Sequence, residues 1–532
     1  MRERQTADAV RPLVFFCVML LAGCARGAGG ETVAAPPELH STNGVLAFTL
    51  DAVLTPQKTP AFSYNGTVGV APTLRLNPGD RLEVTLHDDM QPQPGYSNDV
   101  NLHFHGLMVS PNAPSDDVLT MIAHPGQTLH YVVQIPRNHE PGLYWYHTHI
   151  HGQTFWQVAH GMSGVLVIEG MQQHIPALAA MRERVVVLRQ RPIGSDINEA
   201  GNAPTGPEAV EDADGNPCRP EIALRATIDG VPRERFEIAH GESQFFRVVN
   251  ASASRYFDLS IDGVPLDLVA LDGVPLDAYP GAPAVQRVSH VVLAPAGRAE
   301  FVVRGPAAST LLRSRCFDSG PGGDAQPAGV LADLVVTGES AGAGVPPAPL
   351  VAVKSPTANV LTEPAPSPSV RRTVKLTEDA NRFYINGKSF DMSSMMGQPS
   401  IVAYVGTVEE WNVVNDTDEA HDFHIHQVHF AEESVNGVPV AQRHWIDTVN
   451  VPSRIHHWNG TTPGRVSLLV DFRNPVIHGR FLFHCHILDH EDRGMMALME
   501  VRYRGEPAGL AGRFGLGEGA LCGLPAQRIV KR

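Results

Sequence analysis

Three segments of the chain repeat one strand pattern at nearly equal intervals. Each segment begins at a glycine (Gly79, Gly241 and Gly406), and these glycines lie 162 and 165 residues apart. Apolar residues follow at five and seven positions after the glycine, and an Asp or Asn at nine. Apolar residues two apart after a turn predict a strand with one buried face. The repeat therefore constrains the chain to three copies of one β-rich unit.

The rest of the sequence supports an all-β chain. Its 43 prolines and 49 glycines divide it into short apolar runs, and long helical periodicity is nearly absent. We therefore expect three Greek-key β-sandwich domains. The boundaries we expect are residues 38–172, 173–340 and 370–505 for the domains, 341–369 for a Pro/Ala-rich linker, and 506–532 for a C-terminal tail.

A sulfur-containing motif near the C-terminus predicts a metal site. Cys485 stands between His484 and His486, with His490 five residues after the cysteine and Met495 five further on. Two imidazoles, a thiolate and a weak thioether form the ligand set of blue copper. The preceding residues read as a strand, in which successive side chains point to opposite faces. His484 and His486 should therefore face away from Cys485, towards a second site.

Further histidines supply that second site. Besides the pair around Cys485, the chain has three His-x-His units, and His421 precedes the last of them; the units are His103–His105, His147–His149 and His424–His426. One such unit could arise by chance among 25 histidines, but four, one of them around a cysteine, predict a metal cluster. The expected second domain holds none of these units, so we interpret it as a spacer. Metal binding should then be linked to docking of the first domain on the third.

With these motifs the chain resembles the multicopper oxidases over roughly residues 40–505. The resemblance implies cupredoxin-like domains and four copper ions, one type 1, one type 2 and a type 3 pair. It implies that His421, Cys485 and His490 hold the type 1 copper with Met495 as axial ligand, and that His103 and His424 hold the type 2 copper. The type 3 pair is then held by His105, His147, His149, His426, His484 and His486.

The activity implied by the resemblance is the one-electron oxidation of a donor at the type 1 copper, with four-electron reduction of O2 to water at the other three. His421 or His490 is expected to take the donor electron, and Cys485 to relay it. A laccase-like oxidase of phenols or aromatic amines is one interpretation. A metallo-oxidase of Cu(I), Mn(II) or Fe(II) is the alternative, because both share the same copper ligands. A nitrite reductase lacks a type 3 pair, and a copper-free relative would have lost ligands.

Carboxylates near the cluster would handle protons. In related enzymes an acid lies near the type 2 copper, and Asp116 is the candidate here, with Asp117 as the competing alignment. Glu491 directly follows His490 and is the second candidate. Asp447 is expected to make a buried structural hydrogen bond or to orient a type 1 ligand. His151 extends the second histidine unit but is expected to be structural.

The N-terminus predicts export from the cytoplasm. Three arginines precede a short apolar run that ends in Leu21-Ala22-Gly23-Cys24. This pattern describes an export signal over residues 1–24, and its ending resembles a bacterial lipobox with Cys24 lipidated. An ordinary cleaved signal is the alternative. We expect a protein of the cell envelope, periplasmic and attached to the outer membrane only through this lipid.

Net charge and cysteine content limit the partners and the disulfide bonds that the chain can have. The formal net charge is −15 and no basic run occurs, which argues against nucleic acid as a partner. The expected partners are O2 and a small reducing substrate, with the chain a monomer. Cys218, Cys316 and Cys522 are left after the signal and copper cysteines, and two of them could pair in an oxidising compartment. The sequence leaves open which two.

Overall fold

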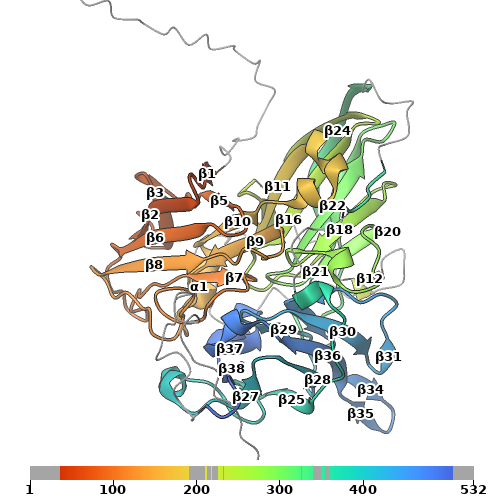
Figure 1. Ribbon diagram of the computed structural model, residues 1–532. Helices are drawn as coiled ribbons and strands as arrows, with labels where there is room; N and C mark the ends of the chain where they lie inside the picture. Colours follow the sequence, from red (N-terminus) through yellow and green to blue (C-terminus); the bar gives the residue numbers. More distant parts are fainter. Residues whose placement is uncertain are drawn as a thin grey trace, which may run out of the picture.

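The strands of the chain form three β-sandwiches, each built mainly from two sheets (Figure 1). The structure is a computed structural model that describes residues 36–190, 210–211, 217–218, 226–231, 233–324, 326–339, 349–353 and 360–506. The all-β prediction is confirmed. The expected signal with Cys24, and all but the first residue of the expected tail, lie outside the described residues.

The first sandwich contains residues from Glu38 to Ile168. One sheet has the strand order β1 (Glu38–His40), β5 (Thr73–Leu76), β10 (Ser163–Ile168), β9 (Gly142–His147), β7 (His103–His105). The other has the order β4 (Thr67–Val68), β3 (Pro60–Tyr64), β2 (Val45–Leu54), β6 (Arg81–Asp88), β8 (Thr128–Gln134).

The second sandwich contains residues from Arg182 to Glu339. Its larger sheet has the order β14 (Ala226–Ile228), β11 (Arg182–Gln190), β16 (Ser243–Asn250), β22 (Arg298–Arg304), β18 (Leu266–Leu271), β19 (Val274–Pro275), with β20 (Gln286–Val288) paired to β18. Its smaller sheet has the order β15 (Glu234–His240), β24 (Gly329–Glu339), β23 (Thr310–Arg315), β17 (Phe257–Ile261), β21 (His290–Leu293). A separate pair joins β12 (Val210–Glu211) and β13 (Pro217–Cys218).

The third sandwich contains residues from Val370 to Arg502. Its larger sheet has the order β26 (Phe383–Ile385), β25 (Val370–Glu378), β28 (Thr407–Asn415), β36 (Gly464–Phe472), β30 (Phe430–Val435), β31 (Val438–Pro439), with β32 (Trp445–Ile446) paired to β30. Its smaller sheet has the order β27 (Ile401–Tyr404), β38 (Met496–Arg502), β37 (Gly479–Cys485), β29 (His421–Ile425), β33 (Thr448–Val451). A hairpin of β34 (Ile455–His457) and β35 (Gly460–Thr462) is separate from both.

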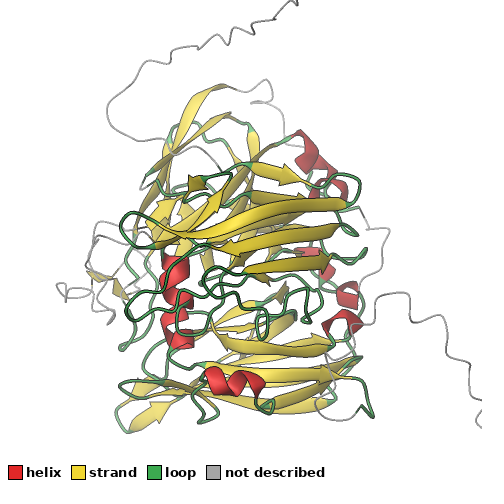
Figure 2. Cartoon of the chain, turned by 90° about the vertical axis from the view of Figure 1, so that its left-hand side faces the viewer, coloured by secondary structure: helices red, strands yellow, loops and turns green. Residues whose placement is uncertain are grey.

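Helices are few and short, and Figure 2 shows them beside and between the strand layers. They are α1 (Thr154–Ala159), α2 (Met171–His174) and α3 (Leu488–Asp492), with 3-10 turns η1 (Pro176–Ala180), η3 (Leu276–Ala278), η4 (Val360–Thr362), η5 (Met392–Met396) and η6 (Pro475–Ile477). Among the described residues, none of these helices has the length and apolar character needed to span a bilayer.

The three repeated segments of the sequence occupy equivalent positions in the three sandwiches. Each forms a strand (β6, β16 or β28) that pairs in parallel with an earlier strand of its own sandwich (β2, β11 or β25). Each also pairs antiparallel with a later strand (β8, β22 or β36). The common pattern of apolar residues therefore reflects one common place in the fold.

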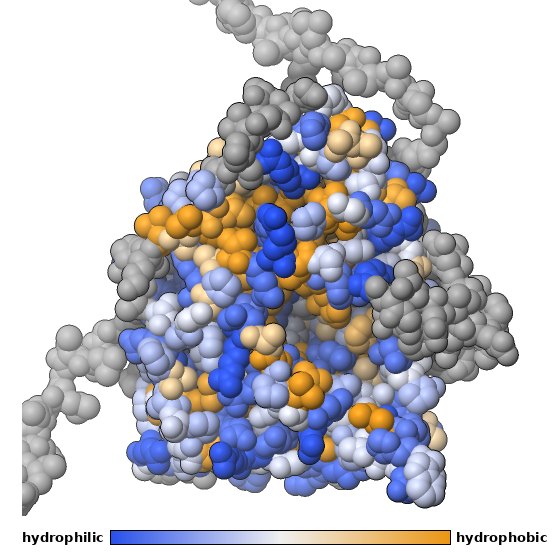
Figure 3. Space-filling view, turned by 90° about the vertical axis from the view of Figure 1, so that its right-hand side faces the viewer, coloured by the Kyte–Doolittle hydropathy of each residue, from blue (hydrophilic) through white to orange (hydrophobic). Residues whose placement is uncertain are grey.

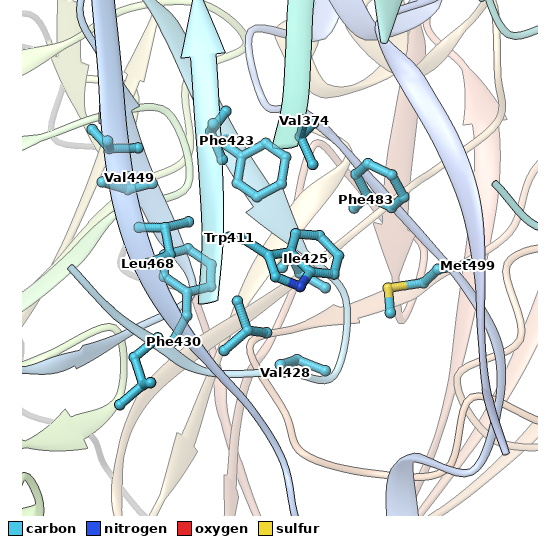
Figure 4. Packing of buried hydrophobic residues seen from close by; sticks show 14 of the residues in the cluster. Val374, Trp411, Phe423, Ile425, Val428, Phe430, Val449, Leu468, Phe483 and Met499 are labelled. Carbon is cyan, nitrogen blue, oxygen red and sulfur yellow. The ribbon is translucent and has the colours of Figure 1, made fainter. Parts of the chain in front are cut away.

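The core of each sandwich lies between its two sheets. In the third sandwich, Trp411 of β28 is fully buried and meets Phe423 and Phe483 from the opposite sheet, with ring centroids 6.4 and 5.7 Å apart (Figure 4). Phe423 and Phe483 belong to β29 and β37, the two strands that carry the last histidine motifs. Packing of this core therefore fixes the strands that present the ligands.

Contacts between the sandwiches lie close to the same strands. The carboxylate of Asp492 in α3 accepts hydrogen bonds from the backbone N–H groups of Gly152, Thr154 and Phe155, at 2.7, 3.2 and 2.8 Å. The backbone N–H of Leu488 donates to the carbonyl of Ala253 in the second sandwich, at 2.9 Å. The segment after Cys485 is therefore attached to both other sandwiches.

The hydropathy of the outer face of the second and third sandwiches differs between its upper and lower parts. Figure 3 shows hydrophobic residues gathered in the upper part of this face and a mainly hydrophilic lower part.

Among the cysteines, Cys316 is disulfide-bonded, whereas the buried Cys485 is a free thiol. The side chain of Cys218 and the whole of Cys522 are outside the described part of the chain. The structure therefore identifies Cys316 as one member of the disulfide that the sequence predicts.

Candidate metal centre

Strand pairing brings the four His-x-His units together two by two. In the first sandwich, His103 of β7 lies directly opposite His147 at the end of β9. In the third sandwich, His424 of β29 lies directly opposite His484 of β37. Groups of candidate ligands combine histidines of both sandwiches, so the two pairs meet at the junction of these sandwiches, and every one of the eight imidazoles is buried. We refer to the eight rings as the imidazole cluster.

Three ring nitrogens of this cluster converge on one point. The Nε2 atoms of His149, His426 and His484 lie 3.1–3.3 Å from one another. Three nitrogens that each bind one ion at about 2 Å are about 3.5 Å apart in a planar arrangement. The spacing therefore fits a shared metal ion.

Two further groups of three histidines complete the cluster. His105, His147 and His486 offer one group of ligand atoms within 4.8 Å of one another, and His103, His105 and His424 offer another. Several ring nitrogens of these groups are buried without a hydrogen-bond partner: Nε2 of His103, Nδ1 of His105, Nε2 of His147, Nε2 of His424, and both nitrogens of His486. Each such atom costs about 1–3 kcal/mol if it stays unpaired, so the donor set favours occupation by cations.

The outer nitrogens of these rings are held by hydrogen bonds. The Nδ1–H groups of His147, His424 and His484 donate to the backbone carbonyls of Thr148, Asp447 and Cys485, at 2.8, 2.7 and 3.0 Å. Such bonds fix the tautomer and leave the inward nitrogen as a lone-pair donor.

A second group contains the sulfur. Cys485 Sγ lies 3.7 Å from Nδ1 of both His421 and His490, and these two nitrogens are 3.1 Å apart. The other nitrogen of His421 is 3.0 Å from Thr417 Oγ1, which fixes the ring. We refer to His421, Cys485 and His490 as the sulfur group. The structure thus places Cys485 away from the groups that contain its two neighbours His484 and His486.

The sulfur group is buried, with one edge nearer to solvent. His421 is fully buried, whereas His490 is 7% exposed. Phe383 stacks on the His490 ring with centroids 4.1 Å apart. Met495 is buried in the same hydrophobic core as Cys485, and its backbone carbonyl accepts from the Cys485 N–H at 3.0 Å. Of the two histidines expected to take an electron from the donor, His490 is therefore the more accessible.

Burial sets the protonation of these groups. It lowers the pKa of both His147 and His421 to about 3, and it lowers the pKa of His103, His149 and His486 well below the ordinary value. The imidazoles are therefore neutral at pH 7, as metal ligands must be. Burial also raises the pKa of Cys485 well above its ordinary value. A thiolate here needs a cation beside it, which fits copper.

Asp116, rather than Asp117, contacts the imidazole cluster. Its carboxylate accepts from Nδ1 of His103 at 3.0 Å and from the backbone N–H of Phe104 at 3.0 Å. Burial raises the pKa of Asp116 to about 7, against the lowering effect of its hydrogen bonds. Asp117 instead accepts from the backbone N–H groups of Leu119 and Thr120 and closes a turn.

Glu491 lies near two other rings of the cluster. Its two oxygens are 3.7 Å from Nδ1 of His149 and 3.3 Å from Nδ1 of His484. The side chain is fully buried, and burial together with neighbouring Asp492 raises the pKa of Glu491 well above its ordinary value. Asp116 and Glu491 therefore lie beside different rings of the cluster.

Asp447 makes the buried structural hydrogen bonds that the sequence predicts, and the alternative, that it orients a ligand of the sulfur group, is wrong. Its Oδ1 lies 3.2 Å from Nε2 of His105, and its backbone carbonyl accepts from His424, so it serves the imidazole cluster. Its carboxylate also forms two hydrogen bonds with Arg298 of the second sandwich, at 2.7 and 2.6 Å. In the sequence, Asp447 lies closest to the histidines of the third sandwich. Its carboxylate nevertheless contacts residues of the other two sandwiches, because it lies at the interface between them.

Sequence reasoning did not identify three residues that contact Asp116 or Asp447. Gln427, which has a left-handed backbone (φ 54°), donates from Nε2 to Asp116. Arg298 and Asp272 reach Asp447 from the second sandwich. The position of Gln427 directly after His426 was the only available signal. For the other two the sequence holds no signal, because they lie more than 145 residues from Asp447.

His151 is not part of any group. It packs edge-on against Phe390 with centroids 5.3 Å apart, and no group of candidate ligands in the described part of the chain includes it.

Comparisons with known proteins match the chain to one family. Two family models, both described as multicopper oxidase, match residues 50–173 and 363–504, which together are half of the chain. The multicopper oxidase mco of Staphylococcus haemolyticus is 24% identical over 448 residues, covering 82% of this chain and 83% of that protein. The cell division protein FtsP of Escherichia coli is 28% identical over 387 residues, covering 69% and 72%. A multicopper oxidase structure from Campylobacter jejuni, titled a metallo-oxidase, superposes with a TM-score of 0.67 at 24% identity, covering 89% and 95%.

Removal of one converging nitrogen tests the site. Replacement of His149 by Ala should lower the bound copper by about one to two ions per chain, since two imidazoles hold an ion less well than three. Metal analysis of the purified protein measures this. The matched control is His151→Ala, in the same histidine run, which should keep its copper. Equal copper loss in both variants would contradict the ligand groups described above.

Proposed function

The chain belongs to the multicopper oxidase family, and from that premise we propose that it binds four copper ions and couples oxidation of a small donor to reduction of O2 to water. The observation that supports this most directly is the separation of the sulfur group from the imidazole cluster, with Cys485 and His484 adjacent in the chain. Copper bound at these positions supplies one-electron transfer and the reduction of O2.

The ligands divide between the sites as follows. The sulfur group holds the type 1 copper, with Met495 as axial ligand. His103 and His424 hold the type 2 copper. One type 3 ion takes His105, His147 and His486, and the other takes the three converging nitrogens of His149, His426 and His484. The orphaned ring nitrogens and the 3.1–3.3 Å spacing support this division.

The protein's own groups connect the two sites. An electron that enters at the accessible edge of His490 passes to Cys485, whose peptide unit leads directly to His484. The Nδ1–H of His484 also donates to the carbonyl of Cys485 at 3.0 Å. The burial of every ligand excludes bulk water from the path. Asp116 and Glu491 hold protons beside the ligand rings and deliver them to the cluster.

For the donor, we propose phenols or aromatic amines, as in a laccase. A second candidate is a metal ion such as Fe(II), Mn(II) or Cu(I), and one observation favours it. Glu378 and Glu419 meet beside His421, with one ligand atom of each within 4.8 Å of the others, and Glu419 lies 3.5 Å from Nε2 of His490. Two carboxylates so close favour a shared cation, and oxygen ligands suit Fe(II) or Mn(II) better than Cu(I).

The place of the protein in the cell is also a proposal. The basic, apolar and lipobox-like N-terminus supports export and lipidation at Cys24, and the disulfide of Cys316 supports an oxidising compartment. We place the protein in the periplasm, as a monomer held to the outer membrane by its lipid.

Replacement of Cys485 by Ser should abolish both the intense blue absorption and donor oxidation, because the soft thiolate ligand and the relay are lost together. Visible absorption and O2 consumption measure the two effects. The type 2 copper signal in electron paramagnetic resonance should persist as an internal control. Donor oxidation at the wild-type rate would refute the relay.

Replacement of Asp116 by Asn should leave the blue absorption intact and slow O2 reduction by about 100-fold, the size expected for loss of a proton donor. Stopped-flow reoxidation of the reduced enzyme measures this rate. Asp117→Asn removes an adjacent carboxylate that only closes a turn and serves as the control. Similar rates in the two variants would exclude the role of Asp116.

Replacement of Glu419 by Gln distinguishes the donors. If a metal ion binds here, its KM should rise roughly tenfold, about 1.4 kcal/mol, while kcat/KM for a neutral phenol changes little. Asp418→Asn, the neighbouring carboxylate bonded to His456, is the control of equal charge. An unchanged KM for Fe(II) and Mn(II) would remove the support for the metal-ion candidate.

A further inference from the structure

Asp447 stands at a junction between two cluster ligands and the second sandwich. One carboxylate oxygen receives the Nε2–H of His105, and the backbone carbonyl receives the Nδ1–H of His424. These two histidines come from different sandwiches and share one group of candidate ligands; His424 is a proposed ligand of the type 2 copper and His105 of the neighbouring type 3 ion. The position of Asp447 therefore affects ligands on both sides of the junction.

The guanidinium that holds Asp447 has all of its donors satisfied. Arg298 donates twice to the Asp447 carboxylate, at 2.7 and 2.6 Å, and its remaining three N–H groups donate to backbone carbonyls. These carbonyls belong to Leu143, Asp272 and Ala296, at 3.3, 2.8 and 3.1 Å. Leu143 is in the first sandwich, Asp272 and Ala296 are in the second, and Asp447 is in the third. One fully buried side chain thus joins all three sandwiches.

Asp272 holds the same segment from a second direction. Its Oδ1 accepts from the backbone N–H of Arg298 at 2.8 Å. Its Oδ2 accepts from the backbone N–H groups of Asp447 and Thr448, at 3.1 and 3.2 Å, and from Thr448 Oγ1 at 3.1 Å. The backbone of Asp272 is left-handed (φ 45°), a conformation that non-glycine residues adopt only when their surroundings hold them there.

Steric constraints show how closely this junction is packed. A Cβ atom added to Gly106, the residue after His105, would lie 2.3 Å from Arg298 Nη2 and 2.6 Å from Asp447 Oδ2. A Cβ atom added to Gly142 would lie 2.2 Å from the carbonyl oxygen of Gly273, the residue after Asp272. The second sandwich therefore approaches the backbone of the ligand-bearing strands directly, with no space for rearrangement.

We propose that the second sandwich, which supplies no copper ligand, positions the type 2 end of the cluster through Arg298 and Asp272, which together fix Asp447 against His105 and His424. Arg298 and Asp272 are positioning residues, since they act through Asp447 and touch no ligand themselves. The inference rests on the proposed assignment of His105 and His424 as copper ligands. It gives the middle sandwich a specific role in the chemistry, beyond that of a spacer.

The test is the substitution Arg298→Lys in the copper-loaded full-length protein. Lysine keeps the positive charge but cannot make two parallel hydrogen bonds to a carboxylate. We expect unchanged blue absorption, because the sulfur group does not contact this junction. We also expect a changed type 2 copper signal in electron paramagnetic resonance and loss of up to about one copper per chain. O2 reduction should be at least roughly tenfold slower, because Asp447, the outer hydrogen-bond partner of His105 and His424, would be displaced.

Arg247→Lys is the matched control. Arg247 is another fully buried arginine of the second sandwich, and it pairs with Glu300 and Glu183 without contacting Asp447. Both variants should lose thermal stability, but only Arg298→Lys should change the type 2 signal. If Arg298→Lys does not fold, Thr448→Val removes a single donor to Asp272 and should shift the same signal to a smaller extent.

The possible outcomes separate the inference from the proposed function. A normal type 2 signal with full copper in Arg298→Lys, or in Thr448→Val if that is the variant obtained, overturns the inference, as does an equal spectral change in Arg247→Lys. Wild-type protein without a blue absorption or a type 2 signal would instead overturn the proposed function. A spectral change confined to the Arg298 and Thr448 variants supports the inference.

Discussion

Everything in this site depends on the alternation of side chains along one strand. β37 ends at Cys485, where the chain turns into α3, and the residues on either side of the cysteine point away from it. The thiolate therefore reaches His421 and His490, while His484 reaches the imidazole cluster. Two sites of different chemistry are thus joined by a single peptide unit, and a shift of register by one residue would exchange their ligands.

The imidazole cluster exists only where two sandwiches meet. Each sandwich contributes four of the eight rings, and in both cases a pair of adjacent antiparallel strands presents them. Docking brings the two sets together and buries them, which neutralises the rings and leaves several nitrogens without partners. The site is therefore costly to form without cations, and under the proposed function copper binding and docking are expected to stabilise each other.

Much of the site could be predicted from the sequence because its chemistry is local. The spacing of His103 and His105, or of His484, Cys485 and His486, is within the reach of one strand, so the motif specifies the ligands. Asp116 and Gln427 also lie close in the sequence to ligands, and Asp116 was identified while Gln427 was not. Asp447 makes the buried hydrogen bond that was expected of it, but its partners could not be predicted, since the sequence does not show which side of the interface a buried carboxylate faces.

The sequence by itself determined the fold class, the repeated sandwich and the identity of the candidate ligands, because strand periodicity and ligand spacing act over a few residues. Only the tertiary structure decided how the ligands are grouped and which residues hold them in place. Arg298 and Asp272 lie 149 and 175 residues from Asp447 in the chain. Contacts of this kind depend on how separate sandwiches dock, and that docking is a property of whole surfaces rather than of any local pattern.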